Sequence, residues 1–181
     1  DIIVHSAGLA ISKPIEETTL ADWDLLQNVL VKGQFLLAQS FATIFRKQKL
    51  GGNIVNIASK NGLVAGPNNL GYGTAKAAQL HMSRLLAMEF APDNVRVNTV
   101  NPDGVIVGSK IWKGKWAEGR AKAYGITVEE LPAYYAKRNL LNKMITPKDI
   151  ANSVFAFLTI LDKSTGNIIN VDGGVANAFV R

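Results

Sequence analysis

The sequence predicts a single α/β domain with a doubly wound parallel sheet. Runs typical of strands alternate with longer runs typical of helices along the whole chain, and this order favours a parallel sheet with helices on both faces. No stretch resembles a linker between domains. The 181 residues are 48% hydrophobic and 19% charged, which is ordinary for one globular domain. We therefore expect one domain over residues 1–181.

The first half of the chain is predicted to contain two strands and one long helix. Residues 1–4 form an apolar run that ends at Ser6, Ala7 and Gly8, and the β-branched run at residues 53–58 is a second strand. The helix between them has Thr19 or Asp22 as its N-terminal cap, and Gly51 and Gly52 end it. Its apolar side chains recur at helical intervals: Trp23, Leu26, Leu30, Phe35, Leu37, Phe41 and Phe45.

The second half continues the same alternation, except for one irregular segment. It is predicted to contain a Gly-, Pro- and Asn-rich loop at 61–71, a helix at 72–90, a strand at 95–100 that Pro102 stops, an irregular segment at 104–146 without a clear strand, a helix at 150–161 and a strand at 167–171. Ligands of such sheets bind at the carboxyl ends of the strands, so we expect the site there.

Composition excludes several classes of function. Cysteine is absent, so disulfides and thiolate chemistry are excluded, and a reducing cytoplasm fits. No signal peptide opens the chain, and apolar stretches such as residues 154–158 are too short to span a bilayer, so no membrane partner is expected. The two histidines, His5 and His81, have no cluster of carboxylates around them. We therefore predict structural roles for both and no metal site.

The net charge of +6 does not indicate a nucleic-acid partner, because the basic residues are scattered and no nucleic-acid motif accompanies them. One basic cluster is interleaved with Trp112 and Trp116; it consists of Lys110, Lys113, Lys115, Arg120 and Lys122. This cluster is either a solvated face of a loop or a pocket wall that attracts an anionic ligand.

Three residues suggest a catalytic site. Tyr72 and Lys76 are four residues apart, so they share one face of the predicted helix. An ammonium group favours the phenolate, so Lys76 should lower the pKa of Tyr72 towards a useful acid or base. Ser59 ends a predicted strand on the ligand side and can donate a hydrogen bond to a carbonyl or alkoxide oxygen. The set suits proton transfer at an oxygen whose carbon exchanges a hydride.

The sequence resembles the short-chain dehydrogenase/reductase family in five blocks, which follow the family's order. These blocks are His5-Ser6-Ala7-Gly8, the strand with its serine at 53–59, the catalytic helix at 72–78, the strand at 95–102, and residues 165–174. The resemblance implies a Rossmann-like fold that uses NAD or NADP. It implies that Tyr72 is the acid/base, that Lys76 lowers its pKa and binds the nicotinamide ribose, and that Ser59 orients the substrate.

The same resemblance implies further contacts to the cofactor. Ser6, Ala7 and Gly8 would line the adenosine side, and Pro102 and the backbone of Val105 would meet the nicotinamide. It also implies a homodimer or homotetramer. Within the family, one branch looks closest on its unusual stretches, namely the dehydrogenase domain of bifunctional rhamnulose-1-phosphate aldolase/lactaldehyde dehydrogenases. The stretches that resemble it are residues 5–8, 29–33, 58–66, 101–103 and 108–112. That similarity implies a small hydroxyaldehyde such as lactaldehyde as substrate, and an aldolase domain upstream.

Three departures from the family pattern stand out. The glycine-rich phosphate turn is missing, since Gly62 and Gly66 have only its first spacing, and we expect the N-terminal strands and this turn to precede Asp1 in the intact polypeptide. Leu30 occupies the place of an asparagine that helps to build a proton relay, and Asn28 faces elsewhere. Asp103 replaces a glycine, where it either contacts the cofactor or forms a turn.

Alternatives remain open at this point. Trp112, Trp116, Tyr134 and Tyr135 either cover a substrate pocket or pack in the core. A sugar-nucleotide epimerase or dehydratase uses the same tyrosine–lysine pair, and a non-catalytic fragment that serves as an assembly module is a third possibility. The choice between NAD and NADP is not encoded in these residues, because the residue that contacts the ribose 2′ position follows a strand outside them.

Overall fold

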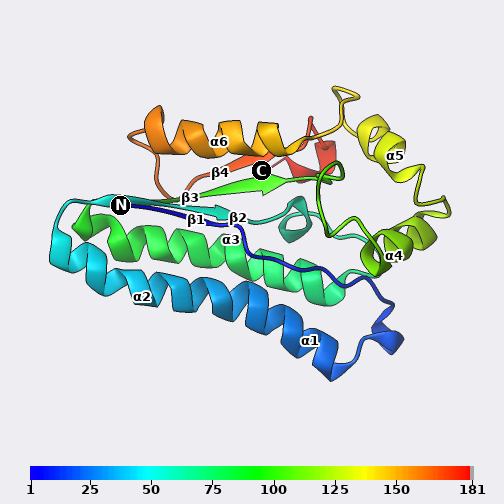
Figure 1. The fold of residues 1–181 in the computed structure, drawn as a ribbon, viewed down its shortest axis with the longest axis horizontal. Helices are drawn as coiled ribbons and strands as arrows, with labels where there is room; N and C mark the ends of the chain where they lie inside the picture. The colour runs from blue at the N-terminus through cyan, green and yellow to red at the C-terminus, as the bar shows by residue number, and fades with distance from the viewer. Residues whose placement is uncertain (180–181) are drawn as a thin grey trace.

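The computed structural model of the chain describes residues 1–179 and contains one four-stranded parallel sheet (Figure 1). The strands are β1 (Ile2–His5), β2 (Gly52–Ile57), β3 (Val95–Pro102) and β4 (Ile168–Val171), and their spatial order is the chain order. All neighbours pair in parallel, so the four carboxyl ends lie at one edge of the sheet. The predicted α/β, Rossmann-like parallel sheet is confirmed.

Helices cover both faces of this sheet. One face carries α1 (Leu20–Leu26), a π-helix (Gln27–Lys32), α2 (Gly33–Gln48) and α3 (Leu70–Phe90), and the other face carries α6 (Pro147–Thr159) (Figure 1). Two short helices, α4 (Lys115–Tyr124) and α5 (Leu131–Lys137), lie beyond the carboxyl edge of the strands. Short 3₁₀ turns occupy Ile15–Glu17, Lys60–Gly62, Ala91–Asp93 and Ala176–Ala178.

The long helix expected after residue 19 is present, with a π-helical interruption. Thr19 is its N-cap, and its hydroxyl accepts a hydrogen bond from the backbone N–H of Asp22, the third helical residue. The Asp22 carboxylate accepts a hydrogen bond from the backbone N–H of Thr19, which completes a capping box. The helix ends at Gln48, because Lys49 adopts a left-handed conformation with φ of 56°. The π-helical turns are wider than α-helical turns, and they lie in the part of this long helix that packs against Tyr72.

The segment 104–146 has no strand, as predicted, but it is more regular than expected. Helix α4 lies between Gly114 and Gly125, both with positive φ, and α5 has Pro132 in its first turn. An isolated bridge joins Val105 to Ile145. Other bounds differ from the prediction by a few residues. For example, α6 begins at Pro147 because Thr146 and Asp149 form a capping box.

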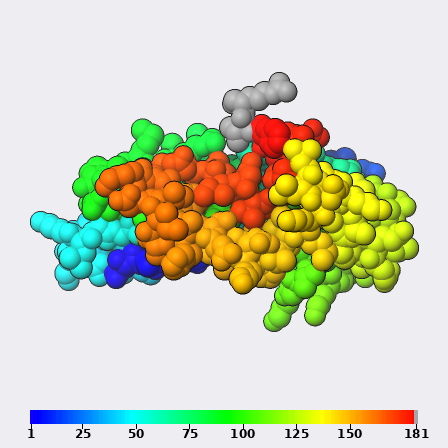
Figure 2. All heavy atoms as spheres, turned by 90° about the horizontal axis from the view of Figure 1, so that it is seen from above, coloured from blue at the N-terminus to red at the C-terminus, as the bar shows by residue number. Residues whose placement is uncertain are grey.

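Two apolar layers hold the helices to the sheet. Ile3, Ile54 and Val97 pack with Phe45 of α2 and Phe90 of α3 on one face. On the other face, Val55 and Val100 pack against Phe157 of α6, which is 1% exposed. Figure 2 shows α6 (orange) lying along this second face, with the yellow segment that includes α5 at one end. Because both faces are covered, the strand ends provide the place for a site.

Candidate active site

A cavity of about 310 Å³ opens at the carboxyl ends of β1, β2 and β3. Its lining includes every residue that the sequence analysis assigned to catalysis or cofactor binding, namely Ser6, Ala7, Gly8, Ser59, Tyr72, Lys76, Pro102 and Val105. These residues come from three strand ends and from the start of α3. The fold therefore brings together in one cavity residues that are up to 99 positions apart in the chain.

Ser59, Tyr72 and Lys76 are buried around this cavity, with exposed fractions of 9%, 9% and 4%. Ser59 caps the 3₁₀ turn after β2, and its hydroxyl accepts a hydrogen bond from the Asn61 backbone at 3.2 Å. Lys76 donates to the Ile57 carbonyl at 3.2 Å, and its ammonium nitrogen lies 5.7 Å from the Tyr72 ring centroid. The helical spacing of Tyr72 and Lys76 thus directs both side chains to the end of β2.

Burial dominates the electrostatics of the pair, contrary to the expectation that Lys76 lowers the tyrosine pKa. Desolvation raises the pKa of Tyr72 to about 12, and a hydrogen bond with Ser59 partly opposes that rise. Desolvation also lowers the pKa of Lys76 to about 7. The group that favours the phenolate in this structure is therefore Ser59. Spacing alone predicted proximity correctly but could not predict the cost of burying charge.

The position of the expected relay asparagine is apolar. Leu30 is fully buried in the π-helix and packs in one cluster with Tyr72, Ala75 and Trp116. Its backbone carbonyl accepts a hydrogen bond from the Gln79 side chain at 2.8 Å. Asn28 is exposed, in agreement with the prediction that it faces elsewhere. Neither side chain lines the cavity.

Aromatic residues from the segment 104–146 form one wall of the cavity. Trp112, Trp116 and Tyr135 line it, with Trp116 5.2 Å from Tyr72 between ring centroids and Trp112 5.0 Å from Tyr135. The same rings also pack in the adjoining apolar clusters. The two alternatives from the sequence, a cover over the pocket and packing in the core, therefore both apply to these three residues. Tyr134 instead stacks on Tyr124 at 4.5 Å and does not line the cavity.

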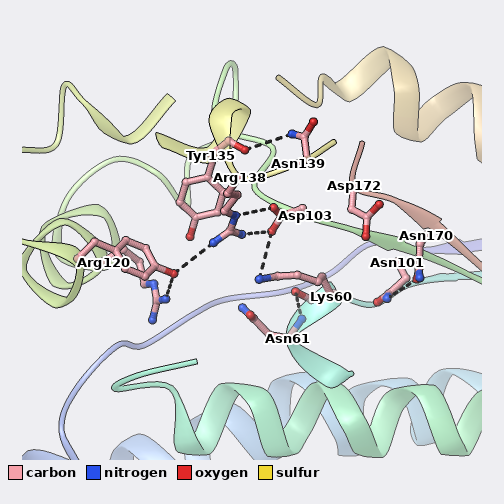
Figure 3. A network of polar contacts seen from close by, with 12 residues as sticks. Lys60, Asn61, Asn101, Asp103, Arg120, Tyr135, Arg138, Asn139, Asn170 and Asp172 are labelled. Carbon is pink, nitrogen blue, oxygen red and sulfur yellow. Dashed lines mark hydrogen bonds and ion pairs between the residues drawn. The ribbon is translucent and has the colours of Figure 1, made fainter. Parts of the chain in front are cut away.

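Asp103 lines the cavity and forms ion pairs that the sequence analysis did not predict. Its carboxylate accepts from the Arg138 guanidinium, with Nε at 3.0 Å from Oδ2, and the Lys60 ammonium lies 3.6 Å from Oδ1 (Figure 3). No local spacing signals this contact, because Asp103 and Arg138 are 35 residues apart. The carboxylate therefore has two cationic partners within the protein.

The basic cluster separates into two environments. Lys110, Lys113, Lys115 and Lys122 are exposed, which matches a solvated face, and none of them lines the cavity. Arg120 is only 2% exposed; its guanidinium donates to the Pro67 carbonyl at 2.6 Å and lies over the Trp116 and Tyr124 rings. Arg120 is thus part of the structure that supports the aromatic wall.

The histidines differ in environment. His5 is 6% exposed, and desolvation together with the charge of Lys76 lowers its pKa, whereas His81 is exposed. Within residues 1–179 no three His, Asp or Glu side chains are grouped as metal ligands would be. In the same range no helix has the length and apolar character needed to cross a membrane.

The fold and the cavity together define a Rossmann-like α/β protein whose site lies at the carboxyl edge of a parallel sheet. The family profile described as "Enoyl-(Acyl carrier protein) reductase" matches residues 1–176. The chain belongs to the short-chain dehydrogenase/reductase family, as the sequence analysis expected.

Three similar proteins illustrate this membership. An uncharacterized oxidoreductase, YuxG, from Bacillus subtilis is 44% identical over all of this chain, which matches 26% of that protein. An uncharacterized oxidoreductase from Thermotoga maritima is 35% identical over 96% of the chain and 66% of that protein. The crystal structure of sorbitol-6-phosphate 2-dehydrogenase SrlD from Erwinia amylovora has a TM-score of 0.89 at 29% identity, covering 97% of this chain and 68% of that one.

The chain spans only part of the curated relatives that it matches, from about a quarter of the Bacillus protein to just under two thirds of the Thermotoga protein. The first of these is therefore a much longer protein than the second. The remaining length of each relative lies outside the stretch that corresponds to this chain.

Proposed function

We propose that this chain forms the catalytic part of an NAD- or NADP-dependent oxidoreductase that interconverts an alcohol and a carbonyl compound. The observation that carries the proposal is the convergence of Ser59, Tyr72 and Lys76 on one cavity at the carboxyl edge of the sheet. Similar proteins support it: the structure of 4-hydroxyisoleucine dehydrogenase complexed with NADH is 26% identical, with a TM-score of 0.80 over 97% of this chain.

The residues of the cavity fit the nicotinamide end of such a cofactor. Within residues 1–179, Lys76 makes one hydrogen bond, to the Ile57 carbonyl. An ammonium has three N–H groups and a neutral amine has two, so in either form N–H groups remain for ribose hydroxyls. Ser6, Ala7 and Gly8 form one wall, and Pro102 and Val105 form another. Small and apolar side chains at these positions leave room for a planar ring. We propose that the phosphate-binding turn is supplied by residues outside this chain.

The bound nicotinamide would supply or accept the hydride. In the reducing direction, Tyr72 holds its proton at neutral pH, because burial raises its pKa, and it donates that proton to the substrate oxygen as the alcohol forms. Ser59 donates a hydrogen bond to the same oxygen and orients it. In the oxidising direction the Tyr72 phenolate takes the hydroxyl proton. Lys76 binds and orients the ribose, and the aromatic wall excludes water.

We propose a small hydroxyaldehyde, such as lactaldehyde, or a sugar-derived polyol as the substrate. A cavity of about 310 Å³ bounded by Trp112, Trp116 and Tyr135 suits a compact molecule. The names of two similar proteins support a polyol-like substrate: sorbitol-6-phosphate 2-dehydrogenase, whose named substrate is a phosphorylated polyol, and a D-threitol dehydrogenase that is 38% identical over 63% of this chain. The length of the Bacillus relative supports the further proposal of an additional domain in the natural protein. That this domain is an aldolase is proposed from the resemblance in sequence alone.

Replacement of Tyr72 by Phe tests the proposed function. The purified protein is assayed with NAD and NADP against lactaldehyde and small polyols, and absorbance of the reduced nicotinamide is followed. We expect Tyr72→Phe to lower kcat by about 10²-fold or more, since it removes the general acid/base, with an unchanged circular dichroism spectrum. Turnover equal to that of wild type would refute the proposal. Product formation without net cofactor reduction would instead indicate an epimerase.

A further inference from the structure

Asp103 joins two different parts of the cavity wall through buried charges. The side chains of Asp103, Lys60 and Arg138 are 5%, 9% and 19% exposed. Arg138 follows α5 and binds Asp103 through two of its nitrogens, while Lys60 directly follows Ser59 at the end of β2 (Figure 3). A carboxylate at the end of β3 thus lies between the serine turn and the aromatic wall.

The contacts continue from Arg138 through the segment 104–146. The Arg138 guanidinium lies 3.7 Å from the Tyr135 ring centroid and donates to the Tyr124 hydroxyl at 3.4 Å. Arg120 also donates to that hydroxyl, and its Nη1 binds the Pro67 carbonyl in the loop before α3. The network therefore runs around the cavity, from the residue after Ser59 to the loop that leads to Tyr72.

The carboxylate has two cations to neutralise. Over residues 1–179, neither Lys60 nor Arg138 has an ion pair with any acidic group other than Asp103. Removing one partner of a buried pair leaves an uncompensated charge, which is far more disruptive than losing a surface pair. Loss of the Asp103 charge would therefore drive both cations towards solvent. Arg138 would take α5 and Tyr135 with it, and Lys60 would disturb the turn that Ser59 caps.

We propose that Asp103 is a positioning residue that acts as a latch. Through Arg138 it holds the α4–α5 segment, and with it Trp112, Trp116 and Tyr135, over the cavity. Through Lys60 it fixes the turn that presents the Ser59 hydroxyl. The effect on the segment is a property of the protein alone, whereas the effect on catalysis rests on the proposed oxidoreductase function.

Tryptophan fluorescence tests the effect of Asp103 on the α4–α5 segment without any assay of activity. The chain has three tryptophans, so Trp23→Phe leaves only Trp112 and Trp116, both in the cavity wall. In this background, we expect Asp103→Asn and Arg138→Met each to raise the acrylamide quenching constant about twofold or more, because Trp116 is only 7% exposed when the segment is held. Lys60→Met leaves Arg138 paired, so its quenching constant should stay at the background value.

Steady-state kinetics test the effect of Asp103 on catalysis. Arg138→Met should raise KM about tenfold with a smaller change in kcat, because the segment must then be ordered on substrate binding. Lys60→Met should lower kcat with little change in KM, since it displaces Ser59, and Asp103→Asn should show both effects. Arg138→Lys, which retains the charge, should restore part of the loss. Arg46→Met, which breaks an exposed pair with Glu89 and Asp93, is the matched control and should change none of these values.

Each outcome is decisive for one proposal. Unchanged quenching in both Asp103→Asn and Arg138→Met overturns the latch, whether or not the protein is active. If Asp103→Asn does not fold, the Arg138→Met and Arg138→Lys pair decides the same question. If the wild-type protein reduces no nicotinamide cofactor with any of the substrates, the proposed function fails, while the quenching result still stands.

Discussion

The Lys76 ammonium lies 5.7 Å from the centre of the Tyr72 ring, and its hydrogen bond goes to the Ile57 carbonyl. Both side chains are more than nine-tenths buried, so the phenol stays protonated up to a pKa of about 12, and the ammonium loses its proton above a pKa of about 7. A pair of this kind stores a proton on the tyrosine at neutral pH. Under the proposed function, this state of the free protein suits the reduction of a carbonyl.

The two reaction directions should therefore differ in their pH dependence. In the proposed mechanism, oxidation needs the Tyr72 phenolate, whose fraction rises about tenfold for each pH unit below the pKa. We expect kcat/KM for alcohol oxidation to rise continuously from about pH 7 to about pH 10, whereas kcat/KM for carbonyl reduction does not rise. Initial rates in both directions over this range provide the measurement. A plateau for oxidation already at neutral pH would contradict a raised tyrosine pKa.

Stability should respond to Lys76 in a defined pH window. Between the folded pKa of about 7 and the ordinary value of 10.5, the unfolded chain holds this proton and the folded chain does not, so the free energy of unfolding rises with pH there. Below about pH 7 both states are protonated, and the full cost of burying the charge applies.

Lys76→Met removes that cost. We expect the variant to have a higher free energy of unfolding than wild type at pH 6 to 7. The difference should be at most about 1.4 kcal/mol for each unit by which the pKa of Lys76 is lowered. It should shrink as the pH approaches 10. Urea unfolding at several pH values checks this expectation. Lys122→Met, at an exposed position of α4, is the control and should show no such trend. A variant that is less stable than wild type at pH 6 would show that the ammonium is well accommodated.

Gly104 sets how closely the aromatic wall approaches the sheet. A Cβ at this position would lie 2.5 Å from Cδ1 of Tyr135, so Gly104→Ala must push that ring away from β3. Overpacking of this kind costs about 1–3 kcal/mol of stability, and the displaced ring should also raise KM. Gly125→Ala tests the alternative that glycine replacement in this segment is harmful in general, because a Cβ there meets nothing within 4 Å and only φ is strained. Equal KM values in the two variants would contradict a specific role for Gly104.

Leu30 should contribute through packing. It is fully buried against Tyr72, so Leu30→Ala should lower the free energy of unfolding by about 2–5 kcal/mol. Leu25→Ala, on the same helical stretch but 48% exposed, should cost much less. Leu30→Asn places an amide in an apolar cluster and should destabilise the fold without raising the rate. A faster Leu30→Asn enzyme would show that an asparagine relay can be rebuilt at this position.

The sequence was sufficient for features that depend on local spacing. Tyr72 and Lys76 share a helical face, and Ser59 ends a strand, so their convergence follows from helix geometry and from parallel strand order. The sequence was insufficient for features that depend on tertiary contacts. The Asp103–Arg138 pair spans an irregular segment, and the pKa of Tyr72 depends on burial by Trp116 and Leu30, which no spacing encodes. Helix α4 was missed because glycines bound it and its apolar periodicity is weak.

The π-helix between α1 and α2 makes this part of the chain intolerant of length changes. Its Leu30 carbonyl is bound by Gln79 of α3, which fixes the wide turn against its neighbour. The wide turn already holds one more residue than an α-helical turn, so inserting a further residue into Gln27–Lys32 would rotate α1 relative to α2 by about 100°. Leu26 would then leave the apolar cluster beneath Tyr72, so the packing under the tyrosine depends on the number of residues in this short stretch.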